Sequence, residues 1–215
     1  MTTAAALILA LPLFVGLTFG ILGATRPQSA ALRHAPVTYL ALLTGLATAV
    51  WTLTPLDLLP RPWLLADGVV VPALWLLAGV VVGVALFAAE RAVLLRRRAT
   101  PAAAAPIRRL GWPETASFLA IAGIEEWLYR GVLMQTLIER GGLAAAAAVA
   151  VSALAFGLNH VAFGPGAVAS KSVFGAVWGG IALGSGGVAA CVASHVAFNA
   201  FVCSPLNRRA AAPPP

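Results

Sequence analysis

The chain has 215 residues, of which 60% are hydrophobic and only 10% are charged, and its mean hydropathy is +0.92. About a quarter of the residues in a soluble globular domain are charged, so this composition excludes a soluble domain. The net charge is +7, but the arginines lie in short segments between continuous apolar runs, a pattern that is typical of helical membrane proteins and disfavours both a nucleic-acid partner and a membrane β-barrel.

Seven apolar segments are long enough to cross a membrane as helices, which takes about 20 residues each. The last two contain several glycines, which membrane helices tolerate where backbones pack closely. The predicted fold is therefore an all-α, polytopic membrane helix bundle with about seven transmembrane helices. The predicted spans are residues 4–24, 36–56, 69–89, 115–138, 143–163, 167–183 and 187–203.

The charge pattern predicts four regions and one orientation. Six arginines lie in the polar segment 91–114. Arginine and lysine are enriched in cytoplasmic loops, so we expect this segment in the cytoplasm, the N-terminus outside and the C-terminus in the cytoplasm of a bacterial inner-membrane protein. The regions are an N-terminal three-span region (1–90), a basic cytoplasmic loop (91–114), a four-span region with the candidate site (115–204) and a disordered tail (205–215).

Two adjacent acidic residues, Glu125 and Glu126, lie near the middle of the fourth predicted span. Charges at the bilayer centre are costly and usually face a bundle interior, where they mark function. Arg130 follows Glu126 by four residues, so these two side chains can pair on one helix face, whereas Glu125 points about 100° away. A buried carboxylate without a close cation can act as a base, which favours Glu125 as the chemical group. The alternative is an ion pair that only packs helices.

Two histidines also lie in apolar spans. His160 ends the sequence Phe156-Gly-Leu-Asn-His160, and His195 precedes Asn199 by one helical turn. Counted along the spans, these histidines share a central-to-cytoplasmic depth with the glutamates, so we expect one cavity that opens to the cytoplasm. A helix–helix hydrogen bond is the alternative role for either histidine. Lys171, just inside the sixth span, is expected to extend its amine to the membrane interface.

Three short motifs, each on a different predicted span, are similar to motifs of one family. They are Glu125-Glu126-Trp-Leu-Tyr-Arg130 (EExxxR), Phe156-Gly-Leu-Asn-His160 (FxxxH) and His195-Val-Ala-Phe-Asn199 (HxxxN). In this order they resemble the CPBP family of intramembrane glutamic endopeptidases, which includes CAAX prenyl endopeptidases and bacterial Abi-like proteins. The resemblance covers about residues 115–204, and it makes this region the catalytic part of the chain.

The resemblance implies an intramembrane endopeptidase. In that reading Glu125 and His160 activate a water molecule, while His195 and Asn199 stabilise the tetrahedral oxyanion. Amide hydrolysis needs both a base and donors for the developing charge. The implied substrate is a membrane-anchored protein or peptide in the lipid bilayer, cut in CAAX-like processing, in removal of a C-terminal sorting signal, or in peptide maturation or self-immunity.

Glu126 and Arg130 would support the base, and no cofactor or metal is expected. A zinc-dependent version stays open as an alternative, because Glu125, His160 and His195 are residue types that bind zinc with an open water position. A non-catalytic transporter or immunity protein is the remaining alternative, since intramembrane Glu and His also build proton relays.

Overall fold

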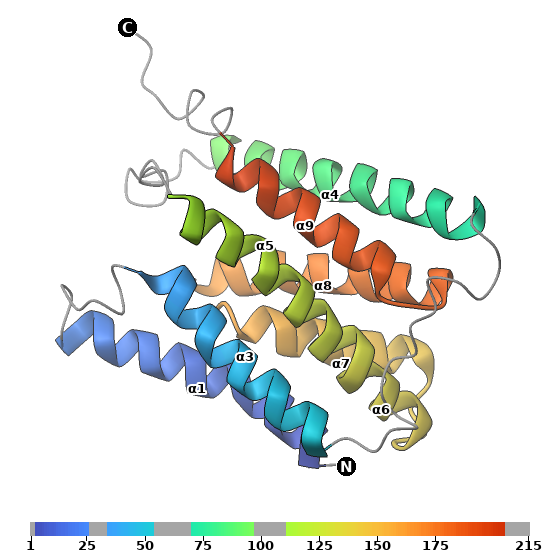
Figure 1. The fold of residues 1–215 in the computed structure, drawn as a ribbon, viewed down its shortest axis with the longest axis horizontal. Helices are drawn as coiled ribbons and strands as arrows, with labels where there is room; N and C mark the ends of the chain where they lie inside the picture. The colour runs from blue at the N-terminus through green and yellow to red at the C-terminus, as the bar shows by residue number, and fades with distance from the viewer. Residues whose placement is uncertain (1–2, 26–33, 54–69, 97–110, 205–215) are drawn as a thin grey trace, which may run out of the picture.

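The computed structural model describes residues 3–25, 34–53, 70–96 and 111–204, and all regular structure within these ranges is helical. Figure 1 shows a bundle in which α4 and α9 lie side by side at one edge and α1 and α3 at the opposite edge. The elements are α1 (Thr3–Thr25), α3 (Ala35–Leu53), α4 (Val70–Arg96), α5 (Trp112–Glu126), η3 (Trp127–Met134), α6 (Gln135–Glu139), α7 (Ala145–Leu158), η4 (Val161–Phe163), α8 (Pro165–Ser185) and α9 (Ala189–Cys203).

The length and apolar surface of the helices indicate an integral membrane protein. Among the described residues, three helices are long and apolar enough to cross a membrane, namely Ala35–Leu53, Ala73–Val93 and Pro165–Ser185. Their outer surfaces carry large exposed apolar side chains, such as Leu74 and Leu77 on α4. Such side chains match a lipid environment, because continuous apolar surface faces lipid tails without cost. The predicted all-α class is thus confirmed for the described residues, and the helices are consistent with a membrane bundle. Three of the seven predicted spans correspond to helices that are long and apolar enough to cross a membrane.

Two predicted spans are shorter in the structure. The span predicted at 143–163 contains a helix only from Ala145 to Leu158, because the chain then passes through η4 and reaches Gly164 at a φ of +90°, where α8 begins. The span predicted at 187–203 begins at Ala189, because Gly186 ends α8 in the left-handed conformation that glycine adopts most readily.

The predicted cytoplasmic loop 91–114 is helical at both ends. Helix α4 continues to Arg96, since its last turns consist of residues with high helix propensity. Helix α5 begins at Trp112, with a proline in its first turn and Glu114 close to the positive end of the helix dipole. Residues 97–110 and the predicted disordered tail 205–215 lie outside the described residues.

Glycines allow α4 and α9 to approach closely. A Cβ atom at Gly79 would collide with the backbone oxygen of Ala190, and one at Gly83 would collide with the backbone oxygen of Ser194. Small residues four apart permit such close backbone contact between membrane helices. The contact fixes α9, and with it His195, against the rest of the bundle.

The centre of the bundle contains a π-helical segment. Element η3 directly follows α5, so that α5, η3 and α6 form one continuous rod, and all residues from Leu128 to Met134 are buried. Widened turns of this kind are rare and are found mostly at functional sites. The segment carries Arg130 into the core, directly after the two adjacent glutamates.

Candidate active site

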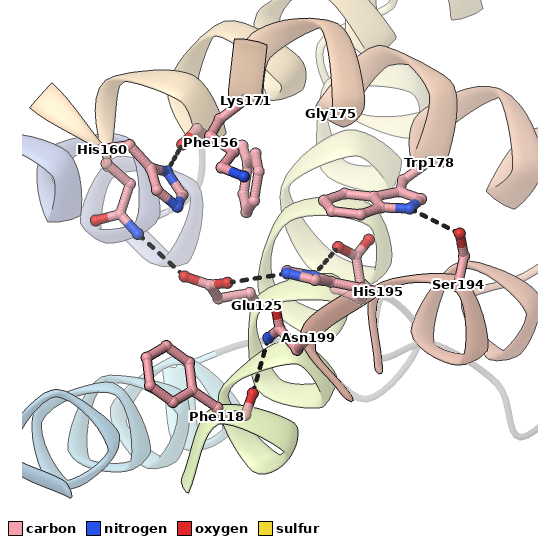
Figure 2. A network of polar contacts seen from close by, with 12 residues as sticks. Phe118, Glu125, Phe156, His160, Lys171, Gly175, Trp178, Ser194, His195 and Asn199 are labelled. Atoms are coloured by element: carbon pink, nitrogen blue, oxygen red, sulfur yellow. Dashed lines mark hydrogen bonds and ion pairs between the residues drawn. The ribbon is translucent and has the colours of Figure 1, made fainter. Parts of the chain in front are cut away.

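The predicted polar residues converge at the middle of the bundle from several helices. Figure 2 shows Glu125, at the end of α5, between His160, which follows α7, and His195 of α9. Only 3% of Glu125 is exposed, and Glu126 and Arg130 are fully buried. The arrangement places two carboxylates, a guanidinium and an imidazole in an apolar interior, where each needs partners.

Glu126 and Arg130 form the contact that their helical spacing predicts. The Nη1 atom of Arg130 lies 3.2 Å from Glu126 Oε1, and its Nη2 atom donates to the backbone oxygen of Gly175 on α8 at 3.0 Å. The guanidinium also lies 4.7 Å from the centre of the Phe156 ring. Because a Cβ at Gly175 would lie only 3.0 Å from Nη2, glycine leaves the space that Arg130 needs. Arg130 therefore joins three helical elements around a single buried charge pair.

His195 lies between the two glutamates. Its Nδ1 atom is 2.9 Å from Glu126 Oε1, and its Nε2 atom is 4.0 Å from Glu125 Oε2. The ring stacks on Trp178 with 4.1 Å between centroids, and the indole N–H of Trp178 donates to the Ser194 hydroxyl at 3.0 Å. Since the carboxylate of Glu126 accepts a hydrogen bond, Nδ1 carries a proton, and Nε2 is the ring nitrogen that faces Glu125.

Glu125 is held by two residues that the sequence analysis did not assign to the site. Its Oε1 atom accepts a hydrogen bond from the Tyr39 hydroxyl at 2.7 Å and one from Asn159 Nδ2 at 3.2 Å. Asn159 directly precedes His160, and an asparagine in an apolar span was a usable signal. Tyr39 lies in the second predicted span, where a tyrosine is ordinary, and so gave no signal. Both donors bind the same oxygen, which leaves Oε2 on the side of His195.

His160 is positioned by its own helix. Its Nδ1 atom lies 3.1 Å from the backbone oxygen of Phe156, one turn earlier. A carbonyl only accepts, so Nδ1 carries the proton and Nε2 of the neutral ring is an acceptor. Figure 2 shows this ring facing the same space as the Glu125 carboxylate. The backbone thus fixes the tautomer that a base or a water ligand requires.

Asn199 lies one turn after His195 on α9 and reaches α5. Its Nδ2 atom donates to the backbone oxygen of Phe118 at 2.9 Å. An amide nitrogen has two hydrogens, so a second one is available for another acceptor. Figure 2 shows Asn199 beside Glu125 and His195.

Lys171 has a partner that the sequence analysis did not predict. Its amine is 2.8 Å and 3.1 Å from the two carboxylate oxygens of Glu90 on α4. It also lies over the rings of Phe174 and Phe198. The reason is that α4 continues past the predicted end of the third span, which brings Glu90 within reach. The pair links α8 to α4 rather than joining the glutamate cluster.

The remaining described residues with metal-binding side chains do not form a further site. Cys191 and Cys203 are buried and form no disulfide. Within the described part of the chain, no group of three or more His, Cys, Asp or Glu side chains has an arrangement that could hold a metal ion.

The comparisons with known proteins agree with the three motifs. Residues 110–201 match the protein-family model described as type II CAAX prenyl endopeptidase, Rce1-like. Neither a curated protein nor a solved structure matches the chain. The family match confirms the resemblance inferred from the sequence and covers α5 to α9, which carry all three motifs. It does not include α1, α3 or α4.

Proposed function

We propose that this membrane protein, whose residues 110–201 match the Rce1-like type II CAAX prenyl endopeptidases, is an intramembrane endopeptidase that uses Glu125 to activate water. The observation that carries the proposal is the geometry of that carboxylate. Its Oε1 atom is fixed by two donors, whereas its Oε2 atom faces His195 Nε2 across 4.0 Å. This separation is too long for a direct hydrogen bond.

A water molecule fits the chemistry of this gap. A water oxygen about 2.8 Å from both atoms would lie beside the line that joins them, and polar groups at such separations are commonly bridged by water. Glu125 then takes a proton from the water while the water oxygen attacks the substrate carbonyl carbon. The tetrahedral intermediate collapses, the carbon–nitrogen bond breaks, and the proton passes from Glu125 to the leaving amine.

The other polar groups supply the remaining functions. His160 presents the lone pair of Nε2 to the same space, so it can accept a hydrogen bond from the attacking water. Asn199 retains an N–H for the oxyanion. His195 donates from Nδ1 to Glu126, so donation to an oxyanion from Nε2 requires the doubly protonated ring. Preorganised donors of this kind each lower the barrier by a few kcal/mol, on the order of 3. Glu126 and Arg130 hold His195 and the helix that carries Glu125.

The proposed substrate is a membrane-anchored protein or peptide. Because the polar site lies among apolar helices, only a substrate segment that lies in or near the bilayer is expected to reach it. The proposed setting is a bacterial inner membrane with seven spans, the N-terminus outside, the C-terminus in the cytoplasm and the site open to the cytoplasm. Catalysis is proposed to need neither metal nor other cofactor, and the protein is proposed to have no nucleic-acid partner.

Cleavage by the purified protein in phospholipid vesicles tests the proposal. The probes are a farnesylated peptide with a CAAX-type C-terminus and a peptide with a short C-terminal transmembrane tag. We expect Glu125→Gln to lose about 100-fold to 10,000-fold in rate, the usual contribution of a general base. Glu139→Gln, an exposed glutamate at the end of α6, is the matched control and should retain full activity. Full activity of Glu125→Gln would refute the proposal.

The same assay separates the two versions of the chemistry. The proposed mechanism predicts that a chelator such as phenanthroline leaves the rate unchanged and that purified protein contains no stoichiometric zinc. A rate that falls with chelator and returns with added zinc would establish the zinc-dependent alternative. The preferred probe also identifies the substrate class, because only one of the two peptides carries a prenyl group.

A further inference from the structure

We infer that Tyr39 is a positioning residue for Glu125, and that helix α3 therefore completes an active site whose other residues lie on α5 to α9. This inference rests on the proposed function of Glu125. Tyr39 lies outside residues 110–201, so the family match does not include it. It reaches the site because α3 packs along α5 and places Tyr39 opposite the last turn of that helix.

Three side chains from three helices form a closed triangle of hydrogen bonds. The Tyr39 hydroxyl donates to Glu125 Oε1 at 2.7 Å and accepts from Asn159 Nδ2 at 2.6 Å. The same amide nitrogen also lies 3.2 Å from Glu125 Oε1. The Tyr39 hydroxyl thus donates to the carboxylate and accepts from the amide, so each of the three polar atoms contacts the other two. It joins α3, α5 and the end of α7 directly at the proposed base.

The triangle controls the rotation of the Glu125 carboxylate. With two donors on Oε1, the other oxygen is kept on the side of His195, where the proposed water lies. Without Tyr39, Oε1 would keep only the longer contact from Asn159, and the carboxylate would sample other rotations. Catalytic groups need positions accurate to about 0.5 Å, and errors of about 1 Å cost roughly 100-fold in rate. The hydroxyl of Tyr39 is thus required for orientation rather than for packing.

The second tyrosine of the chain provides a matched control. Tyr129 is fully buried, and its hydroxyl has no hydrogen-bond partner in the part of the chain that the structure describes. Replacing either tyrosine by phenylalanine removes one oxygen and keeps the ring. Only the replacement at Tyr39 removes a donor from Glu125, so the two variants separate orientation from loss of a buried hydroxyl.

The test compares Tyr39→Phe and Tyr129→Phe with the wild type in the vesicle cleavage assay. We expect Tyr39→Phe to lower kcat by about tenfold or more while KM stays the same, because orientation acts on the reacting state. The thermal midpoint of unfolding should fall only slightly, because two buried hydrogen bonds are lost while the ring is kept. We expect Tyr129→Phe to match the wild type. Asn159→Ala is a second test, since it removes the other donor, and its effect should not add to that of Tyr39→Phe because both act on one oxygen.

An infrared measurement tests the contact without any cleavage. The Glu125 carboxyl band is identified as the difference between the wild type and Glu125→Gln. It should shift in Tyr39→Phe and stay in place in Tyr129→Phe. An unmoved band with unchanged kcat overturns the inference, as does a loss that appears only in KM or in stability. If the wild type cleaves neither probe, the proposed function fails, and the infrared band alone still decides whether Tyr39 holds Glu125.

Discussion

Replacing Arg130 by methionine should destabilise the protein strongly. Arg130 and Glu126 are both fully buried and 3.2 Å apart, so the substitution leaves a carboxylate without its cation in the bundle centre. Removing one partner of a buried ion pair costs about 3–5 kcal/mol. The hydrogen bond from Arg130 to the Gly175 carbonyl is lost as well, which adds about 1 kcal/mol. We therefore expect Arg130→Met to lower the free energy of unfolding by about 4–6 kcal/mol.

The double variant separates this electrostatic effect from lost packing. Glu126→Gln alone leaves the Arg130 cation unpaired and should also cost about 3–5 kcal/mol. Combining both substitutions removes both charges, and the glutamine oxygen can still accept from His195 Nδ1. The double variant should thus be more stable than either single variant, with a coupling of at least about 2 kcal/mol.

Unfolding by sodium dodecyl sulphate in mixed micelles, followed by tryptophan fluorescence, measures these differences. The chain has six tryptophans, so a change in tertiary packing will be visible. Additive effects of the two substitutions, or an Arg130→Met protein as stable as the wild type, would refute the reasoning. Either result would mean that the pair is already solvated or neutral in the folded protein.

Two further predictions concern helix packing. Gly83→Ala should destabilise the protein by about 1–3 kcal/mol, because the added Cβ meets the backbone oxygen of Ser194 and α4 must move away from α9. Gly45→Ala on α3 is the control, because nothing lies within 4 Å of the added Cβ. It should be neutral or slightly stabilising in the same micelle titration. Lys171→Met should destabilise the protein by about 1 kcal/mol or more, because it leaves Glu90 without its ion-pair partner. Adding Glu90→Gln should restore part of the lost stability. Additive losses of stability in a double-mutant cycle would contradict an interaction between the two residues.

Local spacing predicted the parts of the site that lie on one helix. The contact between Glu126 and Arg130 follows from four-residue spacing, and the placement of His195 and Asn199 on one face of α9 follows from the same rule. The helical class and the positions of the rods follow from continuous apolar runs of sufficient length. These features depend on residues that are close together in the sequence, and helical periodicity predicts which of those residues share a face.

The contacts between helices could not be predicted in this way. Tyr39 and Glu125 are 86 positions apart, and His195 and Glu126 are 69 positions apart. Which residues meet at those distances depends on how the helices pack, and no spacing rule describes that. The ends of α7 and α9 were also misjudged, since Gly164 and Gly186 take positive φ values and turn the chain before the apolar composition changes.

The ion pair of Lys171 illustrates the same limit. A lysine near a membrane surface is expected to extend toward water, and its sequence neighbours give no sign of a partner. The partner, Glu90, is 81 positions earlier and is available only because α4 remains helical beyond the apolar run. The helix propensity of the residues after the apolar run indicates that α4 continues to Glu90 and beyond, whereas hydropathy does not.

The most direct measurement follows the oxygen of water into the cleavage product. The wild-type protein in vesicles is incubated in ¹⁸O-labelled water with the membrane peptide that it cleaves, and the products are weighed by mass spectrometry. The account predicts one ¹⁸O atom in the new C-terminal carboxyl group of the wild-type product, and no product above background with Glu125→Gln. Labelled product formed at the wild-type rate by Glu125→Gln would contradict the central claim that this carboxylate activates the water.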